Sequence, residues 1–266
     1  MNNNGTQIAS FIWDLADLLR GDYKRNEYRR VILPFTVLKR FDSVLKDTKQ
    51  EVLKAHSKYK DKFENLDNVL LGASKQPFFN YSKYDFETLL EDPDHIEENL
   101  NHYIDCFSTN VQDIFENFAI KDEIKKLAKK DLLFLLIKKY NSSNLDLHPK
   151  NVTNQDMGTI FEELVRKFNE LSNEEAGEHY TPREVVDLMT HLMFDANKED
   201  ITRKNVIKTV YDPACGTGGM LTGAKNYINS INKDIDVVLF GQELNEETYA
   251  ICKADMLIKG QDVSNI

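Results

Sequence analysis

Three glycines, Gly216, Gly218 and Gly219, lie within four positions of one another. The β-branched segment Val206–Val210 before them predicts a buried strand, and the apolar residues from Leu221 onward recur at helical spacing. Glycines permit a sharp turn and let a ligand approach the backbone where a Cβ would intrude. The amides that open the following helix would point at that ligand. The pattern indicates a ligand-binding turn, although a lone motif fits an ordinary tight turn equally well.

An acidic residue follows the next predicted strand. The segment Val237–Gln242 predicts this strand and delivers Glu243 to its carboxyl end. A carboxylate there can accept hydrogen bonds from both ribose hydroxyls of a nucleoside cofactor. A dinucleotide fingerprint would have a third glycine at position 221, which is Leu221 here, and a shorter spacing to the acid. The acidic run Asp212–Gly219 combined with Glu243 therefore favours S-adenosylmethionine.

A second constellation lies upstream, in the run Gly177–Glu184. Thr181, Pro182 and Glu184 fit a capping box, with Thr181 as the N-cap and Pro182 at the first helical position. The apolar residues from Val185 onward predict that the helix continues on one face. A well-capped helix start is the simpler interpretation, and the functional one adds a helix N-terminus that binds a carboxylate.

These motifs together resemble the modification (M) subunit of type I restriction–modification systems, an adenine-N6 DNA methyltransferase. The resemblance covers nearly the whole chain, with three motifs in the family's order. It implies that S-adenosylmethionine is the cofactor and that its methionine end is wrapped by Glu178, His179, Tyr180, Thr181, Pro182 and Arg183. It likewise implies a glycine motif made of Asp212, Pro213, Ala214, Gly216, Thr217, Gly218 and Gly219, with Glu243 as the ribose acid.

Two residues of the glycine motif have alternative roles. Asp212 is either an acceptor that stabilises the turn or an indirect partner of the cofactor's ammonium, and we favour the second. Cytosine methyltransferases attack with a thiolate from a Pro-Cys pair, but Cys215 is separated from Pro213 by Ala214. We expect Cys215 to be a small side chain tolerated in a tight turn.

The resemblance extends to the N-terminal half, where Leu15–Lys24 and Tyr28–Asp42 are similar to the helical domain that precedes catalysis in this family. We therefore predict an all-helical domain over residues 1–145, followed over 151–266 by the first half of a Rossmann-like methyltransferase domain with about two strands. The linker is predicted at Asn141–Asn144, before Pro149. Helices are predicted over 8–20, 26–46, 48–65, 85–91, 94–105, 110–117, 122–128, 130–140 and 156–171, with Pro34 kinking or splitting the second.

The charge is unevenly distributed. The net charge is −10, with 23 basic and 24 acidic residues in 1–150 and 11 and 20 in 151–266. Strong binding to DNA by the chain alone is therefore not expected, although other subunits can supply phosphate contacts. Seven basic residues nevertheless lie between positions 20 and 40: Arg20, Lys24, Arg25, Arg29, Arg30, Lys39 and Arg40. A solvated helix face is the common explanation, and a surface for DNA or a partner subunit, centred on Arg25, Arg29 and Arg30, is the functional one.

The rest of the composition bears on membrane segments, disulfides and metal sites. No apolar run reaches membrane-spanning length and the N-terminus lacks the regions of a signal peptide, so we expect a cytoplasmic protein without a membrane partner. Three cysteines without a CxxC pair and scattered histidines predict neither structural disulfides nor a metal site.

The family's catalytic loop, an Asn/Asp-Pro-Pro-aromatic sequence, is absent from these residues, because no two of the six prolines are adjacent. We therefore expect an N-terminal fragment whose catalytic residues lie beyond residue 266, and no methyl transfer by this polypeptide alone. The full subunit would act on duplex DNA with a specificity subunit and a restriction subunit. The alternatives are the methyltransferase part of a single-chain restriction–modification enzyme and a non-catalytic helical assembly module.

Overall fold

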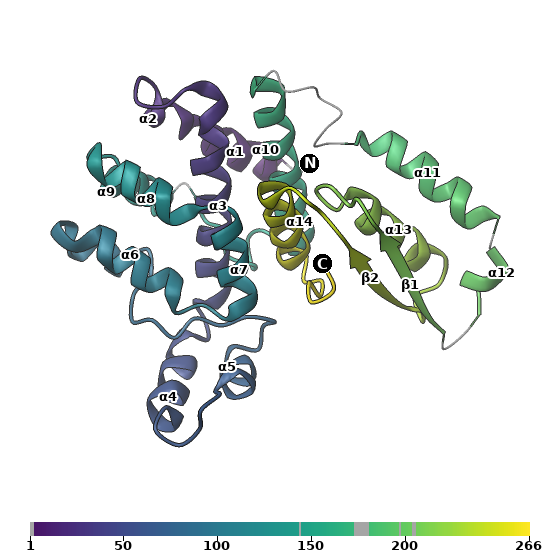
Figure 1. Ribbon diagram of the computed structural model, residues 1–266, viewed down its shortest axis with the longest axis horizontal. Coiled ribbons are helices and arrows are strands. Elements are labelled where there is room, and N and C mark those ends of the chain that lie inside the picture. Colours follow the sequence, from purple (N-terminus) through teal and green to yellow (C-terminus); the bar gives the residue numbers. More distant parts are fainter. Residues whose placement is uncertain (1–2, 144, 173–180, 197, 204–205) are drawn as a thin grey trace.

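The computed structural model describes residues 3–143, 145–172, 181–196, 198–203 and 206–266. Figure 1 shows a helical part on one side, a small sheet with its helices on the other, and α10 and α14 between them. Within the described ranges, the helical part comprises α1 (Asn3–Asp14), α2 (Ala16–Leu19), α3 (Tyr28–Leu45), α4 (Lys49–Tyr59), α5 (Asp67–Ser74), α6 (Ile96–Asp105), α7 (Thr109–Asn117), α8 (Ile120–Lys129) and α9 (Leu133–Tyr140). Short 3-10 turns lie at Arg25–Glu27, Thr88–Glu91 and Pro93–His95.

Helix α3 is the centre of the helical part. Its predicted apolar stripe is buried, with Val31, Phe35 and Leu38 all 0% exposed. Helices α8, α10 and α14 contact it, so polar residues of α3 are buried as well as apolar ones. The helix runs through Pro34 without interruption, so the predicted split does not occur. Burial on all sides offsets the roughly 3 kcal/mol that an interior proline costs a helix.

The segment after α3 departs most from the predicted helices. Helix α4 ends at Tyr59, six residues before the predicted end, and α5 was not predicted. Val52, Leu70 and Phe79 form a small hydrophobic cluster of their own, which fixes α5 against α4. In the loop after α5, Phe78 is buried with its ring centroid 4.6 Å from that of Phe41.

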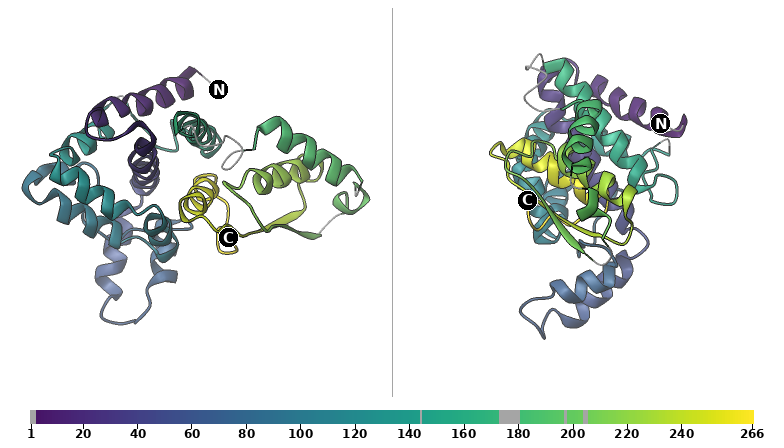
Figure 2. Two further views of the ribbon diagram at one scale, coloured as in Figure 1. Left: turned by 45° about the horizontal axis from the view of Figure 1, so that its top comes forward. Right: turned by 90° about the vertical axis from the view of Figure 1, so that its right-hand side faces the viewer.

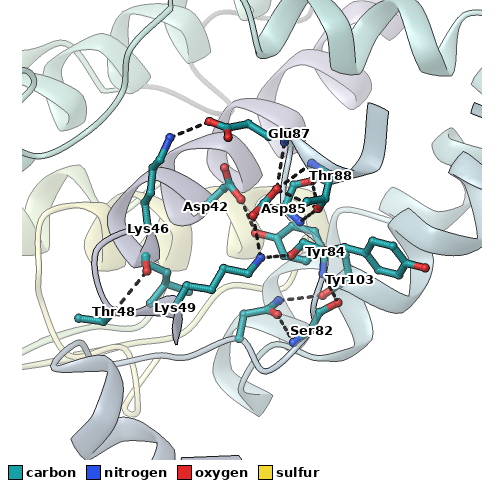
Figure 3. Close-up of polar contacts among 12 residues, drawn as sticks. Asp42, Lys46, Thr48, Lys49, Ser82, Tyr84, Asp85, Glu87, Thr88 and Tyr103 are labelled. Atoms are coloured by element: carbon teal, nitrogen blue, oxygen red, sulfur yellow. Dashed lines mark hydrogen bonds and ion pairs between the residues drawn. The ribbon is translucent and has the colours of Figure 1, made fainter. Parts of the chain in front are cut away.

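A polar network fastens the loop between α5 and α6 to α3 and α4 (Figure 3). The hydroxyl of the fully buried Tyr103 donates to Asp42 at 2.9 Å, and burial raises the pKa of both groups. The ammonium of Lys49 lies 3.1 Å from Asp85, whose Oδ1 accepts from the backbone of Thr88 at 2.8 Å. These contacts pair polar groups that would otherwise be costly to bury.

Helices α10 (Asn154–Ser172) and α14 (Glu246–Ile258) join the helical part to the sheet. Figure 2 shows them between the two parts, where α10 contacts α1 and α3 and α14 contacts α7 and α10. The Lys253 ammonium of α14 lies 2.6 Å from Asp113 of α7. Buried residues from α1 to Val263 belong to one hydrophobic core, so α10 and α14 are fixed by the helical part.

The sheet pairs β1 (Ile207–Asp212) with β2 (Asp236–Gly241) in parallel, with Ile207 opposite Asp236 and Asp212 opposite Gly241. Helix α13 (Gly219–Ile231) contacts both strands, and α11 (Arg183–Asp195) packs on α13, with the short α12 (Lys198–Ile201) after it. The prediction that β1 is buried is wrong: Ile207 is 67% and Tyr211 58% exposed. Among described residues β2 is the one strand that pairs with β1, and alternate side chains of β1 face outward. No described helix is long and apolar enough to cross a membrane.

Candidate cofactor site

The glycine turn joins β1 to α13, as predicted. Gly216 and Gly218 have φ values of +56° and +83°, in the left-handed region that favours glycine. Gly218 is the N-cap of α13, and its carbonyl accepts from Thr222 at 3.0 Å. Asp212 Oδ1 accepts from the Ala214 amide at 3.1 Å. This contact corresponds to the first of the two roles considered for Asp212, an acceptor that stabilises the turn. The turn thus needs glycine at two positions.

Glu243 lies beside this turn at the carboxyl edge of the sheet. Its Oε2 accepts from the Gly216 amide at 3.0 Å, and its Oε1 accepts from the Asn245 amide at 2.8 Å. Asn245 in turn caps α14, because its Oδ1 accepts from the Thr248 amide at 2.9 Å. The carboxylate therefore connects the glycine turn to the start of α14.

The predicted capping box at α11 is wrong. Pro182 is the N-cap, with ψ of 139°, and its carbonyl accepts from the amides of Val185 and Val186. Among the described residues no side chain caps this helix, which begins one residue later than predicted because Pro182 has an extended ψ. Thr181 and Arg183 flank the cap and are exposed, while the predicted residues Glu178, His179 and Tyr180 lie outside the described part of the chain.

A cavity of about 640 Å³ brings these segments together. Predicted residues that line it are Thr181, Arg183, Asp212, Ala214, Gly216, Thr217 and Gly219. Pro182, Pro213 and Gly218 are not in its lining but are each flanked in the sequence by residues that are. Glu243 is also outside the lining and accepts a hydrogen bond from the lining residue Gly216. The opposite wall comes from α10, the end of α14 and the residues that follow α14. It was not predicted from the sequence, and it includes Glu162, Asp255, Lys259 and Gln261.

A charge network forms this opposite wall. The Lys259 ammonium lies 2.7 Å from Glu162 and also contacts Asp255, and Arg183 lies 2.8 Å from the other oxygen of Glu162. Burial raises the pKa of Asp255 to about 6, although the Lys259 charge opposes the shift. Burial alone would lower the pKa of Lys259, but the carboxylates of Asp255 and Glu162 outweigh it and raise that pKa. Arg183 thus links the start of α11 to the wall formed by α10 and α14.

Two cysteines lie beneath the turn. Cys215 is 5% and Cys252 0% exposed. A hydrogen bond from Cys252 lowers the pKa of Cys215. A Cβ added to Gly241 would lie 3.0 Å from Cys215 Sγ, and one added to Gly218 would lie 2.7 Å from Cys252 Sγ. This tight packing agrees with a small side chain at position 215 rather than a nucleophile.

We expect Gly223→Ala to separate α11 from α13, because a Cβ there would lie 2.5 Å from Val186 Cγ1. The cost should be about 1–3 kcal/mol of the free energy of unfolding, the range for overpacking. Urea unfolding measures it, and Val186→Ala in the same chain should recover most of the loss. If the double variant is no more stable than Gly223→Ala, Val186 is not the obstacle.

The basic run between positions 20 and 40 does not form one surface. Lys39 and Arg40 are 8% and 0% exposed, because α3 is enclosed by its neighbours, so their inclusion in a surface was wrong. Arg29 forms an ion pair with Glu247 of α14 at 2.9 Å. Arg25 and Arg30 are exposed, so the prediction of a DNA or subunit contact rests on them. Among described residues, no group of three or more His, Cys, Asp or Glu side chains is placed to hold a metal ion.

Comparisons with known proteins agree with this arrangement. The family described as HsdM N-terminal domain matches residues 8–140, and the N-6 DNA Methylase family matches residues 152–266. The MpnII methylase subunit of Mycoplasma pneumoniae is 22% identical over 97% of this chain and 51% of its own length. The MjaIX methylase subunit of Methanocaldococcus jannaschii is 23% identical over 96% and 46%. Both are named as type I restriction enzyme subunits, and the chain spans about half the length of these curated relatives.

A solved structure shows the same fold. It is the type I restriction–modification system methyltransferase subunit from Streptococcus thermophilus, with a TM-score of 0.70 and 24% identity. The match covers 98% of this chain and 57% of the other. The HsdM N-terminal match takes in half of the 266 residues, and the methylase match begins after it. The chain belongs to the HsdM family, the methylase subunits of type I restriction–modification systems.

Proposed function

We propose that this chain supplies the helical part and the cofactor end of an adenine-N6 DNA methyltransferase subunit, with S-adenosylmethionine as methyl donor. The observation that carries the proposal is the shared cavity, lined by Thr181 and Arg183 on one side and by the turn Asp212–Gly219 on the other. Three segments that the resemblance assigns to the donor thus lie around or beside one space. An ordinary tight turn would not need such a cavity.

The residues present fit this donor. The turn at Gly216 and Gly218 leaves backbone accessible to a nucleoside, since nothing lies within 4 Å of the place of a Cβ on Gly216. Glu243, beside the turn, presents a carboxylate of the type that accepts from ribose hydroxyls. The donor supplies an electrophilic methyl group when bound. The chain's own contribution is to bind and orient it.

The acceptor in the proposed reaction is the exocyclic amine of adenine, a poor nucleophile because its lone pair is delocalised into the ring. Enzymes that act on a base in duplex DNA take it out of the stack. Holding the amine in line with the methyl group then supplies much of the acceleration. In the proposed enzyme, the described residues hold the methyl donor, and the Asn/Asp-Pro-Pro-aromatic loop that the resemblance requires would hold the base.

Glu243→Gln tests the assignment of the ribose. It removes one acceptor from the carboxylate, and a hydrogen bond to a charged group contributes about 1.5–3 kcal/mol, so S-adenosylmethionine should bind about 10- to 100-fold more weakly. Isothermal titration calorimetry measures this, with Glu246→Gln, an exposed acid three residues further on, as the matched control. Tighter binding of NAD than of S-adenosylmethionine by the wild-type chain would contradict the proposal.

The partners we propose are duplex DNA, a specificity subunit that reads the sequence and a restriction subunit. In the assembled complex, Arg25→Glu with Arg30→Glu should lower affinity for DNA and reduce the slope of log affinity against log salt by about 2, one for each lost phosphate contact. The control reverses Lys60 and Lys62, which are exposed beyond the end of α4. An unchanged affinity and slope would remove Arg25 and Arg30 from the DNA surface.

A further inference from the structure

Arg29 and Glu247 form an ion pair between the helical part and the start of α14. The Arg29 Nε atom lies 2.9 Å from Glu247 Oε1, and the two side chains are 13% and 25% exposed. Arg29 belongs to the first turn of α3 and Glu247 to the first turn of α14, two helices that are in contact (Figure 1). Separating the two helix starts would break this mostly buried pair, which is costly.

Glu247 lies four positions after Glu243, and hydrogen bonds fix the residues between them. Asn245 Oδ1 accepts from the Thr248 amide at 2.9 Å and caps α14, and Glu243 Oε1 accepts from the Asn245 amide at 2.8 Å. The other oxygen of Glu243 accepts from an amide of the glycine turn at 3.0 Å. Glu243 is therefore positioned by two elements, the glycine turn and the start of α14, and the ion pair with Arg29 holds the second.

Little apolar packing holds this segment. Residues 244–247 line a cleft of about 800 Å³, together with Arg30 and with residues of α7 and α8. Leu244 is 99% exposed. An open cleft and an exposed leucine leave the position of the segment dependent on the polar contacts of Glu243, Asn245 and Glu247.

Electrostatics gives the pair with Arg29 a direction of effect. Three carboxylates, Glu243, Glu246 and Glu247, lie within five positions of one another. The N-terminal end of α14 carries partial positive charge, which favours them, and the Arg29 guanidinium adds a full charge beside Glu247. Without the guanidinium, mutual repulsion of the carboxylates would move this segment away from the glycine turn.

We propose that Arg29 is a positioning residue for Glu243, through which the helical part sets the affinity of the cofactor site for a nucleoside. Arg29 acts through Glu247 and the start of α14 and does not itself line the cavity. The inference deepens the proposed function and rests on it, because Glu243 is there the acid that binds the ribose. It gives the helical part a role in binding the donor, although none of the cofactor motifs lies in that part.

The test is a double-mutant cycle with S-adenosylhomocysteine as the probe, measured by isothermal titration calorimetry. Arg29→Met keeps most of the apolar stem and removes the charge, and we expect it to weaken binding about 3- to 30-fold. Arg29→Lys keeps the charge and should lose less. In a chain that carries Glu243→Gln, Arg29→Met should cost less than half as much on a logarithmic scale, because the group that it positions is already impaired.

Lys49→Met is the matched control. It breaks the ion pair with Asp85, whose side chains are 15% and 29% exposed, in the helical part and outside the cavity lining. This variant should leave the affinity unchanged, and thermal unfolding monitors folding of every variant. No loss in Arg29→Met, an equal loss in Lys49→Met, or an undiminished loss in the Glu243→Gln background would overturn the positioning role.

A failure of the proposed function has a different signature, because the wild-type chain then binds no nucleoside. Hydrogen exchange tests the positioning by itself, at the amides of Gly216 and Asn245 that donate to Glu243. Faster exchange of both amides in Arg29→Met, with unchanged exchange in Lys49→Met, would uphold the positioning role without the nucleoside function. Unchanged exchange in Arg29→Met would overturn the inference whether or not a nucleoside binds.

Discussion

Replacing Gly218 by alanine is expected to lower the free energy of unfolding by about 2–5 kcal/mol. A non-glycine residue in the left-handed region costs about 1–2 kcal/mol, and overpacking a tight site costs about 1–3 kcal/mol. Both apply at Gly218, where φ is +83° and an added Cβ would lie 2.7 Å from Cys252 Sγ. Cys252 lies on α14 and is 0% exposed, so its Sγ is surrounded by other side chains.

A series of glycine variants separates the two causes. The Cβ of Gly216→Ala would have no atom within 4 Å, but the residue would keep a positive φ. This variant should therefore lower the free energy of unfolding only by the cost of the left-handed backbone, about 1–2 kcal/mol. Gly72→Ala, in α5 with open space and no positive φ, should gain about 0.5–1 kcal/mol. Urea unfolding gives all three values. Cys252→Ala should restore part of the loss in Gly218→Ala, and equal losses at 216 and 218 would show that Cys252 is not the obstacle.

Arg40→Met should lower the free energy of unfolding by about 3–5 kcal/mol, although Arg40 is not among the residues that line the cavity. Arg40 is 0% exposed and donates to the Leu147 carbonyl, to the Val152 carbonyl at 2.9 Å and to Asn154 Oδ1 at 2.8 Å. Burial lowers its pKa to about 10, so it is still a cation at neutral pH. Each buried acceptor left unpaired costs about 1–3 kcal/mol.

The companion variants make this result specific. Arg40→Lys should recover less than half of the loss, because an ammonium cannot reproduce the fork that reaches three acceptors. Arg30→Met, on the exposed side of the same helix, should stay within about 0.5 kcal/mol of the wild type. Hydrogen exchange should speed up over residues 145–153 in Arg40→Met, and unchanged exchange there would contradict the role of Arg40 in holding this segment.

The features that could be predicted from the sequence are those set by residues close together along the chain. The glycine turn, its flanking strand and helix, and the place of Glu243 after the second strand are confirmed, since each follows from local backbone preference and pattern. The predicted capping box at Thr181 was wrong. The sequence pattern placed the N-cap one residue too early, since in the structure Pro182 has an extended ψ and is itself the N-cap. Local patterns thus identify an element better than its boundary.

Features that depend on tertiary packing could not be predicted. The pair between Glu162 and Lys259 joins residues 97 positions apart, and no spacing in the sequence marks it. Arg40 was predicted as one member of a solvated basic run, yet it lies in the stretch 31–41 of α3, where every residue is buried. The burial of β1 was overestimated for the converse reason, because a β-branched run does not specify how many strands lie beside it.

Helix α14 has a consequence for how the molecule unfolds. Two of its residues two positions apart face different surroundings: Lys253 is paired with Asp113 of α7, and Asp255 lines the cavity. A rigid helix cannot release one contact while holding the other in register. We therefore expect the helical part and the cavity to melt as one cooperative unit, and a small molecule that binds in the cavity to raise the melting temperature of helices that it does not touch.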